Sequence, residues 1–225
     1  MSQIERLILS RDFPYLQPYF YNHPWALRCE LGQGRSRSAF RRKARERAEA
    51  IYHVLFPNPA DAVIFNYRLE DWSNTGPALT EAWEISAEEA AGLLKANIRA
   101  EVTQLRFLES MQNRYRHTAV RDLPFDGVEG VRRHRIVCYA DETGFDDLGL
   151  LRRQLRDEGL DISLVSFANE CILSVYDDRG CDIVFASREK LAEFYPRLEP
   201  FFLDYDREEM ARRYGGATCC KSFNN

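Results

Sequence analysis

Residues 171–186, CILSVYDDRGCDIVFA, decide the fold. Two apolar runs, residues 172–176 and 181–186, flank the tetrapeptide at 177–180. Short runs rich in β-branched and aromatic residues, separated by a loop that contains glycine, predict a β-hairpin. We expect Gly180 to adopt the left-handed backbone conformation that closes such a loop, because a Cβ would clash there. Both faces of the two strands are largely apolar, which places them in the middle of a sheet that is covered on each side.

Further strands and helices are expected on both sides of this hairpin. Alternating or continuous apolar residues predict strands over residues 25–31, 61–67 and 135–140. Capping residues and apolar periodicity predict six helices. The first three are expected at residues 2–10, from Ser36 or Ser38 to Phe56, and at residues 86–96. The other three are expected from Asp146 or Asp147 to residue 159, from Ser187 to a stop at Pro196, and at residues 206–214. The expected fold is α+β: a single domain with a mainly antiparallel central sheet of about five strands and helices packed around it.

Three stretches are harder to assign. Residues 97–109 suit either a helix face or an alternating strand, and we favour the strand. Residues 113–130 are polar and rich in turn formers, which indicates a linker or exposed loop. Residues 164–167 suit either a strand or an extended loop before the hairpin.

The domain boundaries follow from these stretches. Residues 1–214 are expected to form the domain, with sub-lobes 1–112 and 131–214 as a finer option. A double glycine ends the last helix, so residues 215–225 are expected to be a mobile tail.

The composition limits the class of function. The 225-residue chain has a net charge of −4, which argues against a nucleic-acid coat. Its longest apolar runs are far shorter than the roughly 20 residues that cross a bilayer. The N-terminus contains Glu5 and has no long apolar run, so no secretory signal is expected. The six cysteines form no CxxC pair, which favours reduced thiols over a metal site. We expect a cytoplasmic protein that has no cofactor and no contact with a membrane.

Clustered carboxylates are the main candidate for a chemical centre. They are Asp177, Asp178 and Asp182 at the hairpin, and Asp204, Asp206, Glu208 and Glu209 near the C-terminus. Such a cluster can bind a divalent metal or serve as acid and base. We favour a structural account. Turn acids bond backbone amides, Asp206 caps a helix, and Arg179 or Arg207 pairs with them.

A basic helix is the second candidate. Its first half carries Arg35, Arg37, Arg41, Arg42, Lys43, Arg45 and Arg47. These charges suit a phosphate-binding face centred on Arg41, Arg42 and Lys43. We favour a solvated face paired with Glu46 and Glu49, because no aromatic residues interleave the charges as single-strand binders require.

Catalytic motifs do not emerge from the sequence. The four histidines lack the i, i+4 spacing of a zinc helix, and no GxSxG elbow occurs. We therefore assign no catalytic residue and no metal ligand.

Several motifs resemble a bacterial family catalogued as domain of unknown function 3885. The matching text is VYDDRGCDIV at 175–184, the helix at 191–195, FFLDYDRE at 201–208, residues 25–32 and residues 47–56. Together these motifs span most of the chain, which departs from the family pattern around residues 70–130. Family members are similar to proteins encoded beside secreted polymorphic toxins, which implies an immunity-type role. The resemblance transfers no catalytic residues.

The expected function is a cytosolic immunity-type binding protein that neutralises a cognate secreted bacterial toxin domain by occluding its active site or substrate entry. The residues expected to bind this partner are Asp177, Asp178, Arg179, Asp204 and Asp206. One alternative is a metal-dependent hydrolase that uses the clustered aspartates. The other is a nucleic-acid-binding protein that uses the basic helix, although the acidic balance makes nucleic acid an unexpected partner.

Overall fold

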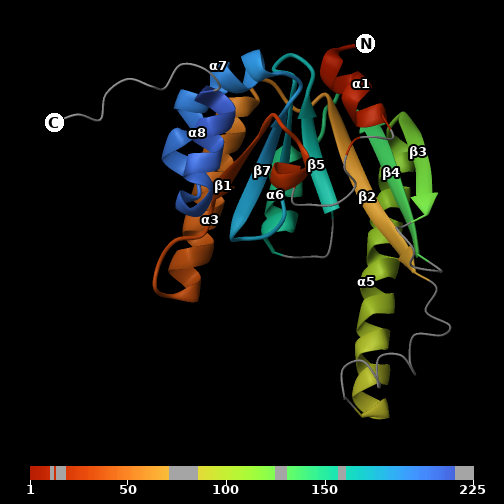
Figure 1. Cartoon of the computed structure of the whole chain (residues 1–225). Coiled ribbons are helices and arrows are strands. Elements are labelled where there is room, and N and C mark those ends of the chain that lie inside the picture. The colour runs from red at the N-terminus through yellow and green to blue at the C-terminus, as the bar shows by residue number, and fades with distance from the viewer. Residues whose placement is uncertain (11–12, 14–18, 71–85, 125–130, 157–160, 216–225) are drawn as a thin grey trace.

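An antiparallel sheet of seven strands, ordered β1-β7-β6-β5-β2-β4-β3, runs through the described part of the chain (Figure 1). This computed structural model describes residues 1–10, 13, 19–70, 86–124, 131–156 and 161–215. The strands are β1 Ala26–Glu30, β2 Ala62–Glu70, β3 His117–Pro124, β4 Val131–Tyr139, β5 Asp161–Ser166, β6 Cys171–Val175 and β7 Gly180–Phe185. The α+β class is confirmed, and the sheet has more strands than the five expected.

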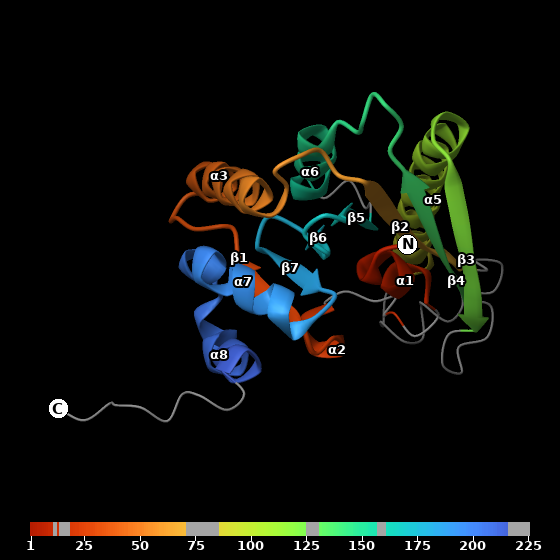
Figure 2. The same cartoon turned by 90° about the horizontal axis from the view of Figure 1, so that it is seen from above.

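Helices cover both faces of the sheet and close its β1 end. They are α1 Gln3–Leu9, α2 Tyr19–Asn22, α3 Arg37–Leu55, α5 Ala87–Arg114, α6 Asp147–Leu155, α7 Arg188–Leu198 and α8 Arg207–Gly215, with short 3₁₀ turns η2 Glu199–Phe201 and η3 Asp204–Asp206. Seen from above, α3, α6 and α5 lie along one face, and α1 and α2 lie on the other (Figure 2). Helices α7 and α8 stand at the β1 end (Figure 2).

The central hairpin is confirmed, but the expected role of its glycine is wrong. Strands β6 and β7 pair antiparallel and are buried along their whole length. The described glycines with positive φ are Gly34 and Gly144, so Gly180 is not left-handed. A Cβ at position 180 would instead meet the Tyr176 ring, at 2.8 Å from Cζ, and the Cys29 carbonyl oxygen, at 2.9 Å. Close packing between the turn and β1, rather than backbone conformation, requires the glycine.

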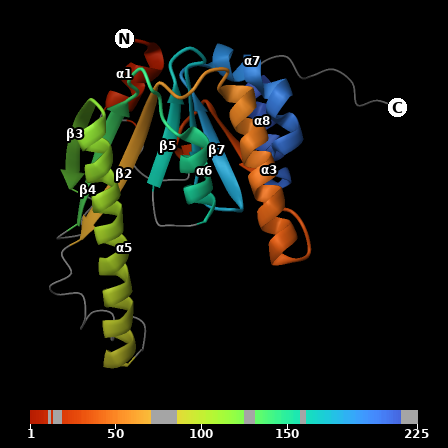
Figure 3. The same cartoon turned by 180° about the vertical axis from the view of Figure 1, so that it is seen from behind.

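The middle of the chain differs most from expectation. Residues 97–109 are helical, not a strand, and belong to the 28-residue α5, which begins with the expected capping box of Ser86 and Glu89. Leu108 and Met111 at the C-terminal end of α5 are buried in the core. Its N-terminal part extends beyond the end of the sheet (Figure 3). The stretch is helical because it continues the capped segment before it and leads to Leu108 and Met111, which pack on the core.

Two further assignments need correction. The stretch 113–130 contains β3, which pairs with β4 at the edge of the sheet. An edge strand has one open side, so its polar sequence is compatible with pairing. Helix α7 continues through Pro196 to Leu198, because apolar side chains before and after the proline hold it on the core. Residues 164–167, left open between strand and loop, fall largely within β5.

The free edge of β1 is covered by the C-terminal segment. Phe202 forms an isolated bridge with Cys29, and the Leu203 N–H donates to the Arg28 carbonyl oxygen at 3.3 Å. Four of the six cysteines are buried free thiols: Cys29, Cys138, Cys171 and Cys181. Cys219 and Cys220 lie outside the described residues, as does the expected tail from residue 216.

Strands β1 and β2 from the first half of the chain each pair with strands from the second half. Strand β1 pairs with β7, and β2 lies between β5 and β4. The division into sub-lobes 1–112 and 131–214 stays a prediction. Among the described helices, none is both long enough and apolar enough to span a membrane.

The packing at the hairpin generates a first prediction. Gly180→Ala should lower the free energy of unfolding by about 1–3 kcal/mol, because the added methyl overpacks the turn. Gly92→Ala, in an exposed turn of α5 with nothing within 4 Å of the new Cβ, is the matched control. It should stabilise the protein by about 0.5–1 kcal/mol. Urea unfolding of both variants measures the difference, and equal effects would contradict this account.

Candidate functional site

A buried ion pair between two neighbouring strands organises the β1 end of the sheet. Arg28 on β1 lies directly opposite Asp182 on β7. The Arg28 Nε–H donates to Asp182 Oδ1 at 2.9 Å, and Nη2 donates to Oδ2 at 3.3 Å. Asp182 is completely buried, and burial raises its pKa, while the Arg28 and Phe20 hydrogen bonds oppose that rise. Removing Arg28 would leave the buried Asp182 carboxylate without a cation.

Two segments distant in sequence attach to this pair. The Phe20 N–H of α2 donates to Asp182 Oδ2 at 2.9 Å, which fixes α2 against the sheet. Asp206 Oδ2, at the end of η3, lies 3.7 Å from Arg28 Nη1. The Tyr21 hydroxyl donates to Asp206 Oδ1 at 3.5 Å, and the Tyr21 ring lies 4.4 Å from the Arg28 guanidinium carbon. We call this arrangement the β1 corner: Tyr21, Arg28, Asp182, Tyr205 and Asp206.

The hairpin turn lies beside the β1 corner. The Leu31 N–H, just past β1, donates to the Arg179 carbonyl oxygen at 2.8 Å. Asp177 Oδ1 accepts the Arg179 N–H at 2.7 Å, and its other oxygen lies 2.6 Å from Arg179 Nη2. Asp178 Oδ2 lies 3.6 Å from Arg41 Nε on α3. Asp177 therefore holds the turn, as the structural account predicts, whereas the contact of Asp178 with Arg41 joins the turn to α3.

The C-terminal acids divide into buried and exposed positions. Asp206 is buried in the β1 corner, whereas the Asp204 side chain is 93% exposed and reaches Arg207 at 3.1 Å. Tyr205 between them is 87% exposed. The structure thus gathers the predicted residues of both acidic stretches around the end of β1, but only some of them face solvent.

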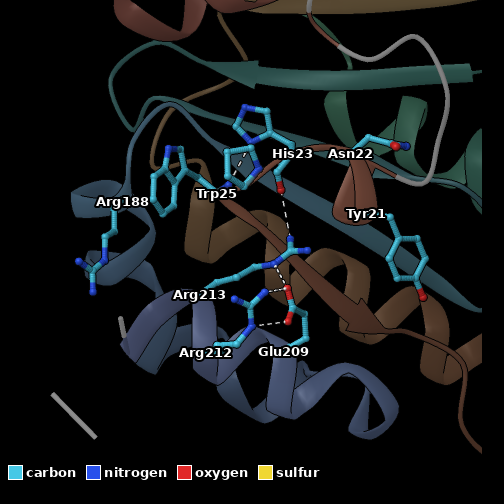
Figure 4. A pocket seen from close by; sticks show the side chains of 9 residues that line it. Tyr21, Asn22, His23, Trp25, Arg188, Glu209, Arg212 and Arg213 are labelled. Carbon is cyan, nitrogen blue, oxygen red and sulfur yellow. Dashed lines mark hydrogen bonds and ion pairs between the residues drawn. The ribbon is translucent and has the colours of Figure 1, made fainter. Parts of the chain in front are cut away.

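A groove of about 510 Å³ opens beside the corner, between the segment before β1 and α8 (Figure 4). Its lining residues are Tyr21, Asn22, His23, Pro24, Trp25, Arg188, Glu209, Arg212 and Arg213. Tyr21 belongs to both the groove and the β1 corner, so the two surfaces are continuous.

Hydrogen bonds from Arg213 fix one wall of this groove. Its Nη1 donates to the carbonyl oxygens of Phe20 at 2.6 Å and His23 at 3.1 Å, and its Nε donates to Glu209 at 2.7 Å (Figure 4). Burial, and secondly the Arg213 charge, lower the pKa of His23 to about 4. The neutral His23 accepts the Trp25 N–H on Nδ1 at 3.2 Å. The groove wall is therefore a fixed surface.

The basic half of α3 is paired along the helix. Arg42 and Lys43 reach Glu46 at 3.1 and 3.5 Å, and Arg45 reaches Glu49 at 2.9 Å. Glu46 and Glu49 are the partners that the solvated-face interpretation names. The phosphate-binding role of Arg41, Arg42 and Lys43 stays a prediction.

The described part of the chain contains no cluster of side chains with the arrangement of a metal site. No group of three or more His, Cys, Asp or Glu there is arranged to hold a metal ion. Asp182 and Asp206 face a guanidinium, and Asp177 bonds a backbone amide. These oxygens are engaged in fixing loops and strands.

Sequence reasoning did not single out Arg28, Tyr21 or Tyr205. One feature of the sequence could have indicated Arg28. It is a charged residue between Leu27 and Cys29, in a strand whose centre is otherwise apolar. Asp182 interrupts the hairpin strand in the same way. Two such interruptions in strands that pair predict a buried ion pair, because an isolated buried charge is too costly. The tyrosines carry no comparable signal.

Breaking the central pair gives a second prediction. Arg28→Ala should lower the free energy of unfolding by about 3–5 kcal/mol, because Asp182 becomes an uncompensated buried charge. The double variant Arg28→Met/Asp182→Leu should recover part of that loss, since it removes the uncompensated Asp182 charge but leaves Asp206 without its cation and the Phe20 N–H without its acceptor. Chemical unfolding of both variants measures this. A single variant as stable as the parent would show that the pair does not anchor the corner.

The groove gives a prediction on pH. Hydrogen bonds from Arg212 and Arg213 lower the pKa of Glu209 from 4.5 to about 2. A depressed carboxyl pKa stabilises the fold above the unfolded value and loses that contribution as the pH falls through the folded value. The parent should therefore lose more stability than Glu209→Gln between pH 4.5 and 2. Thermal unfolding across this range tests it, and parallel curves would contradict it.

The comparisons with known proteins agree with the resemblance in the sequence. The family model described as domain of unknown function (DUF3885) matches residues 7–206, which is most of the chain. The comparison with curated proteins and that with solved structures each found no match. The match includes every strand of the sheet and the whole β1 corner. The chain therefore belongs to the DUF3885 family.

Proposed function

We propose that the chain is an immunity-type protein that binds a cognate toxin domain through the β1 corner and occludes its active site or substrate entry. The observation that carries this proposal is Tyr205, an aromatic side chain that is 87% exposed on a fixed 3₁₀ turn. Large aromatic side chains placed in solvent on a rigid support are typical anchors of protein interfaces. The toxin partner itself comes from the family resemblance.

Contacts on its buried side fix the 3₁₀ turn that carries Tyr205. Its neighbour Asp206 is buried against Arg28, and the Leu203 N–H bonds β1. A side chain on a fixed backbone loses little conformational freedom on binding, so more of its contact energy appears as affinity. Tyr21, 58% exposed and stacked on Arg28, offers a second aromatic surface at the same corner.

The exposed charges around Tyr205 favour a basic partner. Asp204 and Glu208, on either side of Tyr205 in sequence, are both exposed. Arg207 between them pairs with Asp204 at 3.1 Å, which leaves one negative charge in excess among the three. Together with the net charge of −4, this excess would steer the approach of a cationic surface. Asp177, Asp178 and Arg179 at the neighbouring turn extend this surface.

The hydrolase and nucleic-acid alternatives make different predictions. A hydrolase built on the clustered aspartates requires saturable binding of a divalent cation, which calorimetric titration measures. A nucleic-acid binder requires affinity that falls steeply with salt and is lost when Arg41, Arg42 and Lys43 become alanine. The contacts of the clustered aspartates and of the basic residues on α3 favour neither alternative over protein binding.

The experiment uses the toxin domain encoded beside the gene. Co-expression should protect cells from the toxin, and the two purified proteins should bind each other. Tyr205→Ala should raise the dissociation constant about 30-fold or more, as loss of an interface anchor does. Asp204→Lys should slow association, and the difference should shrink at high salt.

Glu109→Lys, an equal charge change at an exposed position of α5, is the control and should bind like the parent. Failure of the parent to bind or to protect would overturn the function. Binding that Tyr205→Ala leaves unchanged would place the interface elsewhere on the protein.

A further inference from the structure

A second groove, of about 350 Å³, lies between α5 and α6, two helices on the same face of the sheet (Figure 2). We call it the arginine groove. Its lining residues are Phe107, Met111, Arg114, Tyr115, Phe145, Asp146, Gly149, Leu150, Arg152, Arg153 and Arg156. It is separate from the β1 corner, because α6 packs on β5 and β6, whereas the corner is at the end of β1.

Arginines predominate among the charged residues of this groove. Among the described lining residues, four are arginines and one, Asp146, is acidic. Asp146 Oδ1 accepts the Gly149 N–H at 3.0 Å and caps α6. Arg152 also contacts Glu49 on α3 at 3.1 Å. In a chain with a net charge of −4, four arginines from two neighbouring elements therefore line one concave surface.

Aromatic rings hold two of the guanidinium groups in place. The Arg153 guanidinium carbon lies 4.1 Å from the centre of the Phe107 ring, which itself packs edge-on against Phe65. The Arg114 guanidinium carbon lies 4.8 Å from the centre of the Tyr115 ring, and its Nη2 donates to Thr143 Oγ1 at 3.1 Å. These supports reduce the freedom that the two side chains would lose on binding a ligand.

We propose that the arginine groove binds a small oligophosphate anion. Planar guanidinium forks match the geometry of phosphate oxygens, and four arginines line this concave surface. The volume falls in the range of small-molecule sites. This inference goes beyond the proposed toxin binding and does not depend on it.

The test is a calorimetric titration of the full-length protein with sodium tripolyphosphate at low and at moderate salt. The parent should bind with saturation at one site. Arg153→Gln and Arg156→Gln should each weaken binding about tenfold or more, because each removes a charge-assisted contact. Arg153→Lys keeps the charge but loses the planar fork, so its affinity should lie between those of the parent and Arg153→Gln.

The control replaces Arg41, Arg42 and Lys43 together with glutamine. This variant removes three exposed positive charges outside the groove and should bind like the parent. Thermal unfolding confirms that each variant is folded. If Arg153→Gln is not folded, the binding of Arg153→Lys is compared with that of the parent instead.

Two results would overturn the proposal. They are no saturable binding of tripolyphosphate by the parent, and equal weakening of that binding in the α3 control. Tripolyphosphate binding that persists when toxin binding fails, or the reverse, separates this site from the β1 corner.

Discussion

The buried pair of Arg28 and Asp182 is the interaction on which the β1 end of this structure depends. It sets the register of β1 against β7, since a slip of one residue would place Arg28 opposite an apolar neighbour and leave both charges unpaired. It also binds the Phe20 amide and attracts Asp206. Segments near residues 20, 28, 182 and 206 are thereby brought to one place, so the order of the surface around Tyr205 depends on a charge pair that solvent hardly reaches.

Sequence patterns predicted the parts of the fold where local and tertiary preferences agree. The hairpin of β6 and β7, the long α3 and the capped start of α5 were all expected from their residues. Prediction failed where a pattern fits two structures. Residues 97–109 alternate as a strand does and also place apolar side chains on one helical face, and continuity with the capped segment before them decides for helix. Strand β3 was missed because an edge strand needs few apolar residues.

The candidate site was predicted in part, because a cluster of acidic residues can be recognised in the sequence, whereas the residues that they contact cannot. Asp177 was expected to close a turn and does so. Asp206 was expected to cap a helix, yet its carboxylate faces Arg28 and Tyr21. Which acid is buried depends on which strand lies against it, and that pairing joins residues about 180 positions apart. The exposure of Tyr205 depends on the same pairing, so no local pattern could have predicted it.

The distribution of charge explains why the proposals place two kinds of ligand at separate sites. On α3, Glu46 and Glu49 follow the basic residues by one helical turn, so much of that charge is balanced within the helix. On α5 and α6 the arginines come from different elements and line one concave surface. At the β1 corner Asp182 is hydrogen-bonded by both Arg28 and the Phe20 N–H, while aromatic and acidic side chains face solvent. A surface supported by such a buried and hydrogen-bonded ion pair is suited to present a rigid contact, which is the basis of the proposal that a partner binds at that end of the sheet.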